Sequence, residues 1–152
     1  MSLIDGRLSR RLFLGASIST VLTPAWGEPI FTDGQGLALQ GYDPVAFFKL
    51  RSALKGSPDH EIVDKDRTWR FASEAHLTAF EKDREAFMPA FGGYDAWGIS
   101  RGYKRRTDPQ LWVEGGGRIF LFYSIGHQNL WAGDIEKNIA LGDANWPELE
   151  RT

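Results

Sequence analysis

The chain has 152 residues, of which 42% are hydrophobic and 25% charged, as is ordinary for one globular domain. It contains no cysteine, which excludes disulfides, zinc–thiolate sites, iron–sulfur clusters and thiol nucleophiles. The formal net charge of −2 argues against nucleic acid as a partner, and a chain of this size folds without a structural metal.

The first 27 residues have the pattern of an export signal. The sequence SRRLFLG at residues 9–15 is similar to the twin-arginine motif and departs from it only at Gly15. The apolar run that follows is shorter than the roughly 20 residues that cross a bilayer, so we expect no membrane span after cleavage. Small residues allow cleavage after Ala25 or Gly27. We therefore predict a twin-arginine signal peptide over residues 1–27 and a periplasmic mature protein, with an amphipathic N-terminal helix as the alternative.

The mature chain is predicted to form one domain over residues 37–149, after an extended, glycine-containing lead-in at residues 28–36. Asp43 followed by Pro44 predicts the start of a short helix. The Asp carboxylate caps free backbone N–H groups there, and Pro has no N–H that needs a partner.

A hairpin and a helix are predicted next. The charged turn at residues 64–67 separates two strand-like segments, the second of which places Trp69 and Phe71 on one face. Ser73 is a helix cap by residue type, and the apolar spacing after it predicts a helix from Glu74 to Lys82.

A second hairpin and a last helix are predicted in the second half of the chain. Three glycines at 115–117 predict a hairpin whose second strand, from Ile119 to Tyr123, is apolar enough to be central. Asp134 is the predicted cap of a last helix that closes at Trp146-Pro147. The predicted fold is α+β: one domain with a small antiparallel sheet of two hairpins, packed with three to four short helices. Residues 41–47 and 93–98 share Gly-Tyr-Asp, which we treat as chance because no solenoid repeat is present.

Six stretches, in the right order, resemble the YHS domain family: LQGYDPVAFF, WRFASEAHLTAFEKD, FGGYDAWGIS, DPQLWV, GRIFLFY and GDANWPEL. The likeness is strongest to the exported bacterial YHS domain-containing (seleno)proteins and spans about residues 37–149. It implies a protein associated with metal handling or with multicomponent hydroxylases, for which metal binding has been proposed.

The chain departs from the family at its thiols. The resemblance implies cysteines in three places where Ala46, Ala72 and His76 stand here, and a cysteine or selenocysteine where Asp95 stands. The Gly-Gly-Tyr frame of the loop is kept. A hard carboxylate in place of a soft thiolate excludes thiol chemistry at residue 95.

Asp95 has three interpretations. It caps a helix that begins at Ala96, or it contacts a metal or ligand at the family's site, or it acts as a general base paired with His76. The metal interpretation takes His76 and Asp95 as ligands for zinc, copper or nickel, with His60 or His127 as further candidates. Against it, His76 suits a partly buried packing position, His127 a surface or packing position, and His60 an exposed one.

The loop and the segment after it are the predicted binding region. The candidate ligand-binding residues are Gly92, Gly93, Tyr94, Asp95, Trp97 and Arg101. Trp97 is placed to stack on a ligand. The basic run from Arg101 to Arg106 is either a solvated face or an anion-binding rim beside the glycines.

These observations favour a periplasmic YHS-type binding module without catalysis of its own. It would recognise a metal ion, a small ligand or a partner protein around residues 92–106. The alternatives are an accessory component of an oxidoreductase or metal-handling system, and a protein-interaction domain that has lost the family site.

Overall fold

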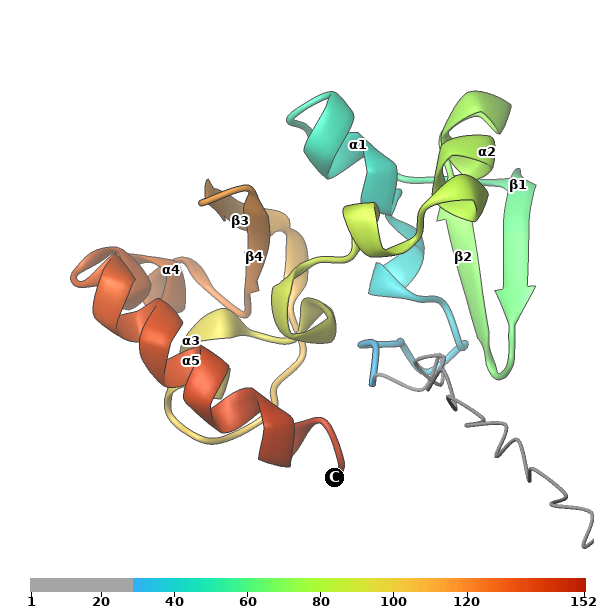
Figure 1. The fold of residues 1–152 in the computed structure, drawn as a ribbon. Helices are drawn as coiled ribbons and strands as arrows, with labels where there is room; N and C mark the ends of the chain where they lie inside the picture. Colours follow the sequence, from blue (N-terminus) through green and yellow to red (C-terminus); the bar gives the residue numbers. More distant parts are fainter. Residues whose placement is uncertain (1–28) are drawn as a thin grey trace, which may run out of the picture.

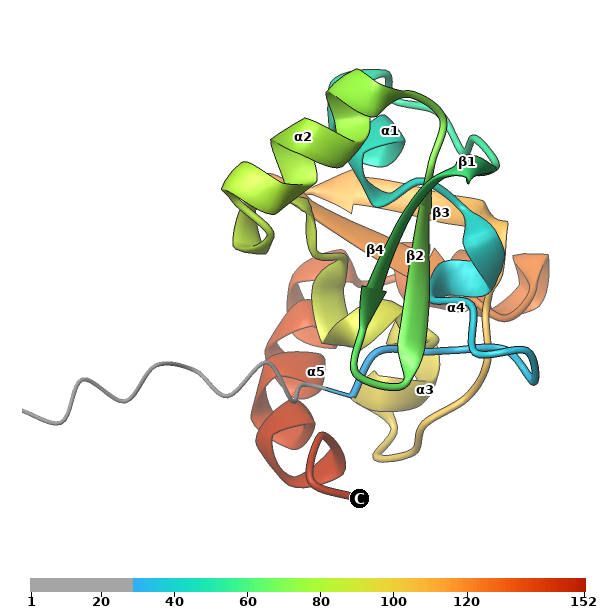
Figure 2. The same ribbon diagram turned by 90° about the vertical axis from the view of Figure 1, so that its right-hand side faces the viewer.

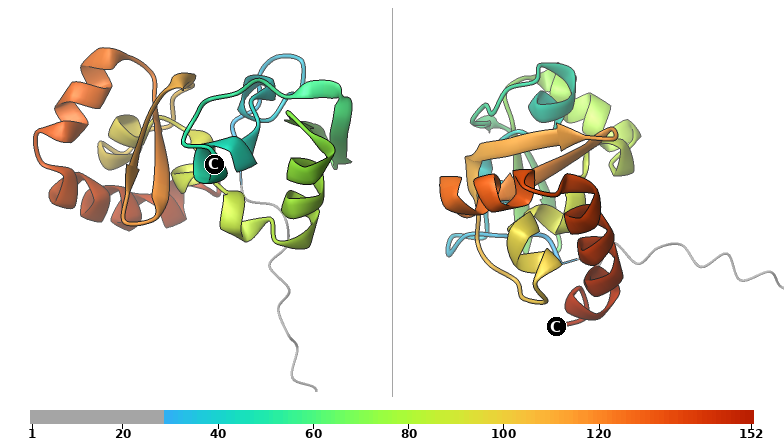
Figure 3. Two further views of the ribbon diagram at one scale, coloured as in Figure 1. Left: turned by 90° about the horizontal axis from the view of Figure 1, so that it is seen from above. Right: turned by 90° about the vertical axis from the view of Figure 1, so that its left-hand side faces the viewer.

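Two antiparallel hairpins organise the fold in the computed structural model, which describes residues 29–152. The first pairs β1 (Ser57–Asp64) with β2 (Arg67–Phe71), and the second pairs β3 (Asp108–Gly115) with β4 (Arg118–Phe122). Each hairpin is a separate two-stranded sheet, so the predicted hairpins are confirmed. They belong to two halves of the molecule that lie side by side (Figure 1; from above in Figure 3).

Five α-helices surround the hairpins in the described residues. They are α1 (Pro44–Lys49), α2 (Glu74–Lys82), α3 (Ala96–Ser100), α4 (Ile125–Ala132) and α5 (Ile135–Leu149). Helix α2 packs on the first hairpin, which is nearest the viewer in Figure 2, whereas α3 and α4 contact β4 and α5 packs along α3. The prediction of one α+β domain is confirmed. Helix α4 was not predicted, and α5 continues to Leu149 instead of closing at Trp146-Pro147.

A side chain caps the N-terminus of each of these five helices by accepting a backbone N–H. The caps are Asp43, Ser73, Asp95, Ser124 and Asp134. Caps of this kind satisfy N–H groups that have no partner inside the helix. They explain why helices as short as these begin at these residues.

Strand β4 joins the two halves because both of its faces are buried. Ile119 and Leu121 pack into the core of the first half, whereas Phe120 and Phe122 pack into the core of the second. Successive side chains of a strand point to opposite faces, so one fully apolar strand serves both cores. The sequence prediction of a central strand here is confirmed.

The two halves have the same backbone architecture. Each begins with a tight turn of three residues at positive φ: Leu39, Gln40 and Gly41 in one, and Phe91, Gly92 and Gly93 in the other. Each continues with a capped helix, a hairpin and a second capped helix. The hairpin registers also break at matching places, after Ser57 in β1 and after Asp108 in β3.

The cores of the halves correspond as well. In the first, the Phe80 ring on α2 lies 4.9 Å from the Trp69 ring on β2. In the second, the Trp131 ring on α4 lies 5.0 Å from the Phe120 ring on β4. The shared Gly-Tyr-Asp therefore marks equivalent positions of a structural repeat, and its interpretation as chance is wrong. The sequence pattern does not show the repeat, because the two halves share backbone conformation and helix caps far more than they share side chains.

Candidate functional site

Asp95 is a fully buried carboxylate that holds three elements together. Its Oδ2 accepts the backbone N–H of Gly98 in α3 at 3.0 Å, and its Oδ1 accepts that of Tyr123 after β4 at 3.1 Å. The Nδ1 atom of His127 on α4 lies 2.6 Å from Oδ2. The prediction that Asp95 caps a helix beginning at Ala96 is confirmed.

The prediction that His76 is the partner of Asp95 is wrong. The Nδ1 atom of His76 lies 2.5 Å from Oδ2 of Asp43, a buried carboxylate that also accepts the backbone N–H of Ala72 at 2.8 Å. His127, expected to be a surface or packing residue, is the partner of Asp95 instead, and its side chain is 17% exposed. The sequence signal was present: each histidine lies three residues after a capping serine.

We call each Asp–His pair, with the backbone groups that the carboxylate accepts, a clamp. Because the clamp occurs once in each half, at equivalent positions, its first role is structural. A buried carboxylate needs hydrogen-bond donors around it, and a buried backbone N–H needs an acceptor. The clamp satisfies both needs where a helix start meets a strand end.

The residues predicted to hold a metal are not assembled into a metal site. His76 and Asp95 have different partners, and the Nδ1 atom of His60 lies 3.3 Å from Glu74. Across residues 29–152, His, Asp and Glu side chains form no group of three or more that is arranged to bind a metal ion. Zinc sites in proteins use three or four such ligands, so the donor set here does not fit zinc.

The Gly-Gly loop faces the interior of the protein. The carbonyl of Gly92 accepts the N–H of Phe31 at 2.9 Å, and the carbonyl of Gly93 accepts the Thr107 hydroxyl at 2.8 Å. Both glycines are buried: Gly92 lies against Pro29, and Gly93 lies against the side chains of Leu39, Pro89 and Leu121. The structure therefore gives the predicted ligand-binding glycines a packing role.

The other predicted ligand contacts also have protein partners. The half-buried Tyr94 packs its ring against Phe31, and burial raises the pKa of Tyr94 although the charge of Arg67 opposes this. The Arg101 guanidinium lies 4.0 Å from the centroid of the Trp97 ring and donates to Asn138 at 2.5 Å. Trp97 thus carries an arginine in place of a stacked ligand.

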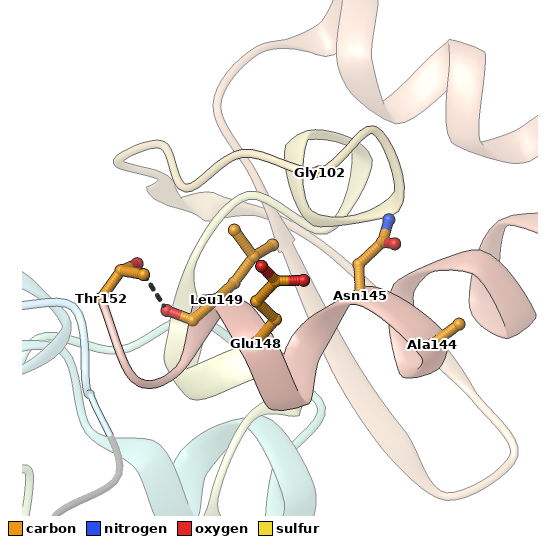
Figure 4. Close-up of a pocket in the computed structure, with 6 residues that line it drawn as sticks. All are labelled: Gly102, Ala144, Asn145, Glu148, Leu149 and Thr152. Carbon is orange, nitrogen blue, oxygen red and sulfur yellow. Dashed lines mark hydrogen bonds between the residues drawn. The ribbon is translucent and has the colours of Figure 1, made fainter.

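A small surface hollow lies along α5, between this helix and Gly102 (Figure 4). Its lining residues are Gly102, Ala144, Asn145, Glu148, Leu149 and Thr152. The Asn145 amide already donates to the carbonyls of Ile99 and Ser100. The hollow therefore offers few free polar groups to a ligand.

A cluster of cations lies beside the clamp of the second half. The Arg105 guanidinium carbon is 3.6 Å from the centroid of the Tyr123 ring, and that of Arg106 is 5.4 Å from it. The His127 ring centroid is 5.6 Å from that of Tyr123. We call Arg105, Arg106, Tyr123 and His127 the anion face.

The two arginines of the anion face differ from most other arginines of residues 29–152 in their electrostatic partners. Four arginines form ion pairs with carboxylates: Arg51 with Glu114, Arg70 with Glu61, Arg84 with Asp64, and Arg118 with Asp143. Within the described part of the chain, neither Arg105 nor Arg106 has such a carboxylate partner. Both side chains are exposed, so their N–H groups are open to an external anion.

The positive charge of the anion face affects the pKa of Tyr123. A hydrogen bond from Arg105, and then the charge of the same guanidinium, lower the pKa of the Tyr123 phenol, with a smaller effect from Arg106. A phenol whose ionised form is favoured by neighbouring cations marks a place where negative charge is stabilised.

Replacing Arg105 with Gln is expected to raise the pKa of Tyr123, because it removes both the hydrogen bond and the nearest charge. NMR titration of the Tyr123 ring measures this, and Arg106→Gln should cause a smaller rise. The ionised phenol contributes its full stabilisation of the wild-type fold above the unfolded-chain value of about 10, and that contribution is lost as pH falls through the lower folded pKa. Equal pKa values in wild type and Arg105→Gln would contradict the contact.

Comparison with protein families, with curated proteins and with solved structures gives no match. Within residues 29–152, no helix combines the length and the apolar character needed to cross a membrane. The predicted signal peptide lies outside the described residues.

Proposed function

We propose that this protein is a binding domain for a small anion, a phosphate or a carboxylate, without catalysis of its own. The observation that carries the proposal is a difference between two equivalent halves. Both have an Asp–His clamp, but only the second places two arginines without a carboxylate partner and a tyrosine beside it.

The differences between the two halves distinguish groups that bind a ligand from groups that hold the fold. At the positions that correspond to Arg105 and Tyr123, the first half has Leu54 and Ala72. A role in folding alone would not need a guanidinium and a phenol in one half only. The added groups are the ones that recognise oxyanions, since guanidinium N–H groups match the geometry of carboxylate and phosphate oxygens.

The clamp fixes the orientation of His127 at the edge of the anion face. With the carboxylate of Asp95 accepting the proton of Nδ1, Nε2 of the neutral ring is an acceptor, so His127 would accept an O–H of hydrogen phosphate while the arginines donate to its charged oxygens. Each hydrogen bond to a charged group contributes about 1.5–3 kcal/mol. Two such bonds, totalling about 4 kcal/mol, correspond to a Kd of about 1 mM.

Calorimetric titration with inorganic phosphate, and separately with acetate, tests the proposal. We expect one site, and at least a tenfold loss of affinity in Arg105→Gln/Arg106→Gln. Lys55→Gln, at the position of the first half that matches Arg106, is the control and should bind as the wild type does. Heat of binding that persists unchanged in the double variant would contradict the anion face. An absence of binding to either anion would favour the protein-interaction domain.

The YHS relationship and the export stay part of the proposal. They are supported by the ordered family motifs over residues 37–149 and by the twin-arginine pattern at residues 9–15. A metal ion is a weaker candidate than a small anion, because the expected ligands are divided between the two clamps. The mass of the exported protein would give the cleavage site, and an intact mass in the periplasm would contradict cleavage.

A further inference from the structure

We infer that the first half contains a second, latent copy of the anion site, at Leu54, Lys55, Ala72 and His76, which lacks only the arginine and the tyrosine. The inference rests on the proposed function for the identity of the ligand. Its structural basis is the repeat, in which the backbone groups that position the anion face occur twice.

The segment that carries the arginines is fixed in the same way in both halves. The backbone N–H of Asp95 donates to the carbonyl of Arg105 at 3.0 Å, and that of Asp43 donates to the carbonyl of Leu54 at 2.8 Å. Residue 54 is therefore tied to its clamp as residue 105 is. Lys55, the next residue, is a cation at the sequence position of Arg106, and its Nζ atom lies 5.9 Å from the centroid of the Tyr42 ring.

The position of the tyrosine corresponds as well. The N–H of Tyr123 donates to the Asp95 carboxylate at 3.1 Å, and the N–H of Ala72 donates to the Asp43 carboxylate at 2.8 Å. Each residue follows the last residue of its hairpin, Phe122 or Phe71. A tyrosine at residue 72 would start from an equivalent backbone position.

The histidines complete the correspondence. The N–H groups of His76 and His127 both donate to a capping serine hydroxyl at 3.2 Å. Their Nδ1 atoms lie 2.5 and 2.6 Å from the clamp carboxylates, and their side chains are 13% and 17% exposed. The halves thus differ at this surface in side-chain identity: Leu54 and Ala72 are exposed at the positions of Arg105 and Tyr123, and Lys55 stands in place of Arg106.

The test adds the missing groups. In Leu54→Arg/Ala72→Tyr, calorimetric titration with inorganic phosphate is expected to show two sites where the wild type shows one. The NMR signals of His76 should then shift with phosphate, as we expect those of His127 to do. Both substituted residues are exposed, so we expect the variant to fold, and its thermal unfolding must match that of the wild type.

The control is Leu50→Arg/Ala72→Tyr, which adds the same charge and ring but places the arginine at another exposed position. It should keep one site. A single site in Leu54→Arg/Ala72→Tyr, with His76 unaffected, would overturn the inference while one-site binding by the wild type still supports the proposed function. A second site in the control as well would overturn it too, since added charge alone would explain the result. If the wild type binds no phosphate, the proposed function fails. If Leu54→Arg/Ala72→Tyr also binds none, the inference fails as well.

Discussion

Asp95→Ala is expected to lower the free energy of unfolding by about 3 kcal/mol. The substitution leaves the backbone N–H groups of Gly98 and Tyr123 without their acceptor and His127 without its partner, all around a fully buried position. Each buried polar group left without a partner costs about 1–3 kcal/mol. Urea unfolding followed by circular dichroism measures the loss.

Two variants calibrate this result. Asp43→Ala removes the equivalent carboxylate of the first half and should cost a similar amount, because that clamp makes the same kinds of bond. Asp143→Ala removes a half-exposed carboxylate paired with Arg118 and should cost less than about 1 kcal/mol. An Asp95→Ala variant as stable as the wild type would show that the clamp is not structural.

Gly92→Ala is expected to destabilise the protein by about 3 kcal/mol. A Cβ atom at residue 92 would lie 2.0 Å from the carbonyl oxygen of Pro29, so the first described segment would have to move away. That movement would break the hydrogen bond from Phe31 to Gly92. Urea unfolding measures the cost, and faster cleavage by a protease near residue 31 would show where the structure opens.

The chain offers a matched control for this substitution. Gly116 has the same φ of +60°, but a Cβ atom there would meet nothing within 4 Å. Gly116→Ala should therefore cost only the left-handed backbone term, about 1–2 kcal/mol. In the first half, Gln40 occupies the position equivalent to Gly92 at φ 55°. A residue with a Cβ atom is therefore accepted in this backbone conformation when no neighbour blocks it. Equal losses in the two glycine variants would mean that backbone strain, and not the Pro29 contact, requires Gly92.

Much of the fold could be predicted from local signals. Asp43 before Pro44 and Ser73 before the apolar run gave two helix starts, because capping depends on residue type at one position. The hairpin turns were equally local. Helix α4 was missed because its apolar residues do not form a one-sided stripe: Ile125 and Leu130 are exposed. Its cap, Ser124, was the available signal.

The site was harder to predict because it depends on pairing between distant segments. Asp95 was recognised as important, but its histidine partner is set by which helix follows which hairpin, and sequence spacing does not show this. The glycines were assigned to a binding loop although both are buried, Gly92 against Pro29 and Gly93 against Leu39 and Leu121. Arg105 and Arg106 were seen as a basic run, and only the Tyr123 contact distinguishes them from a solvated face.

The most direct test of the account is one NMR titration of the wild-type protein with inorganic phosphate, followed through its histidine side-chain signals. The chain has three histidines, and His76 lies in a clamp like that of His127 but without the arginines and the tyrosine. We predict saturable shifts at His127 and unchanged signals at His76 and His60. Shifts of similar size at His76 and His127, or no shift at His127 up to several times the expected Kd of about 1 mM, would contradict it.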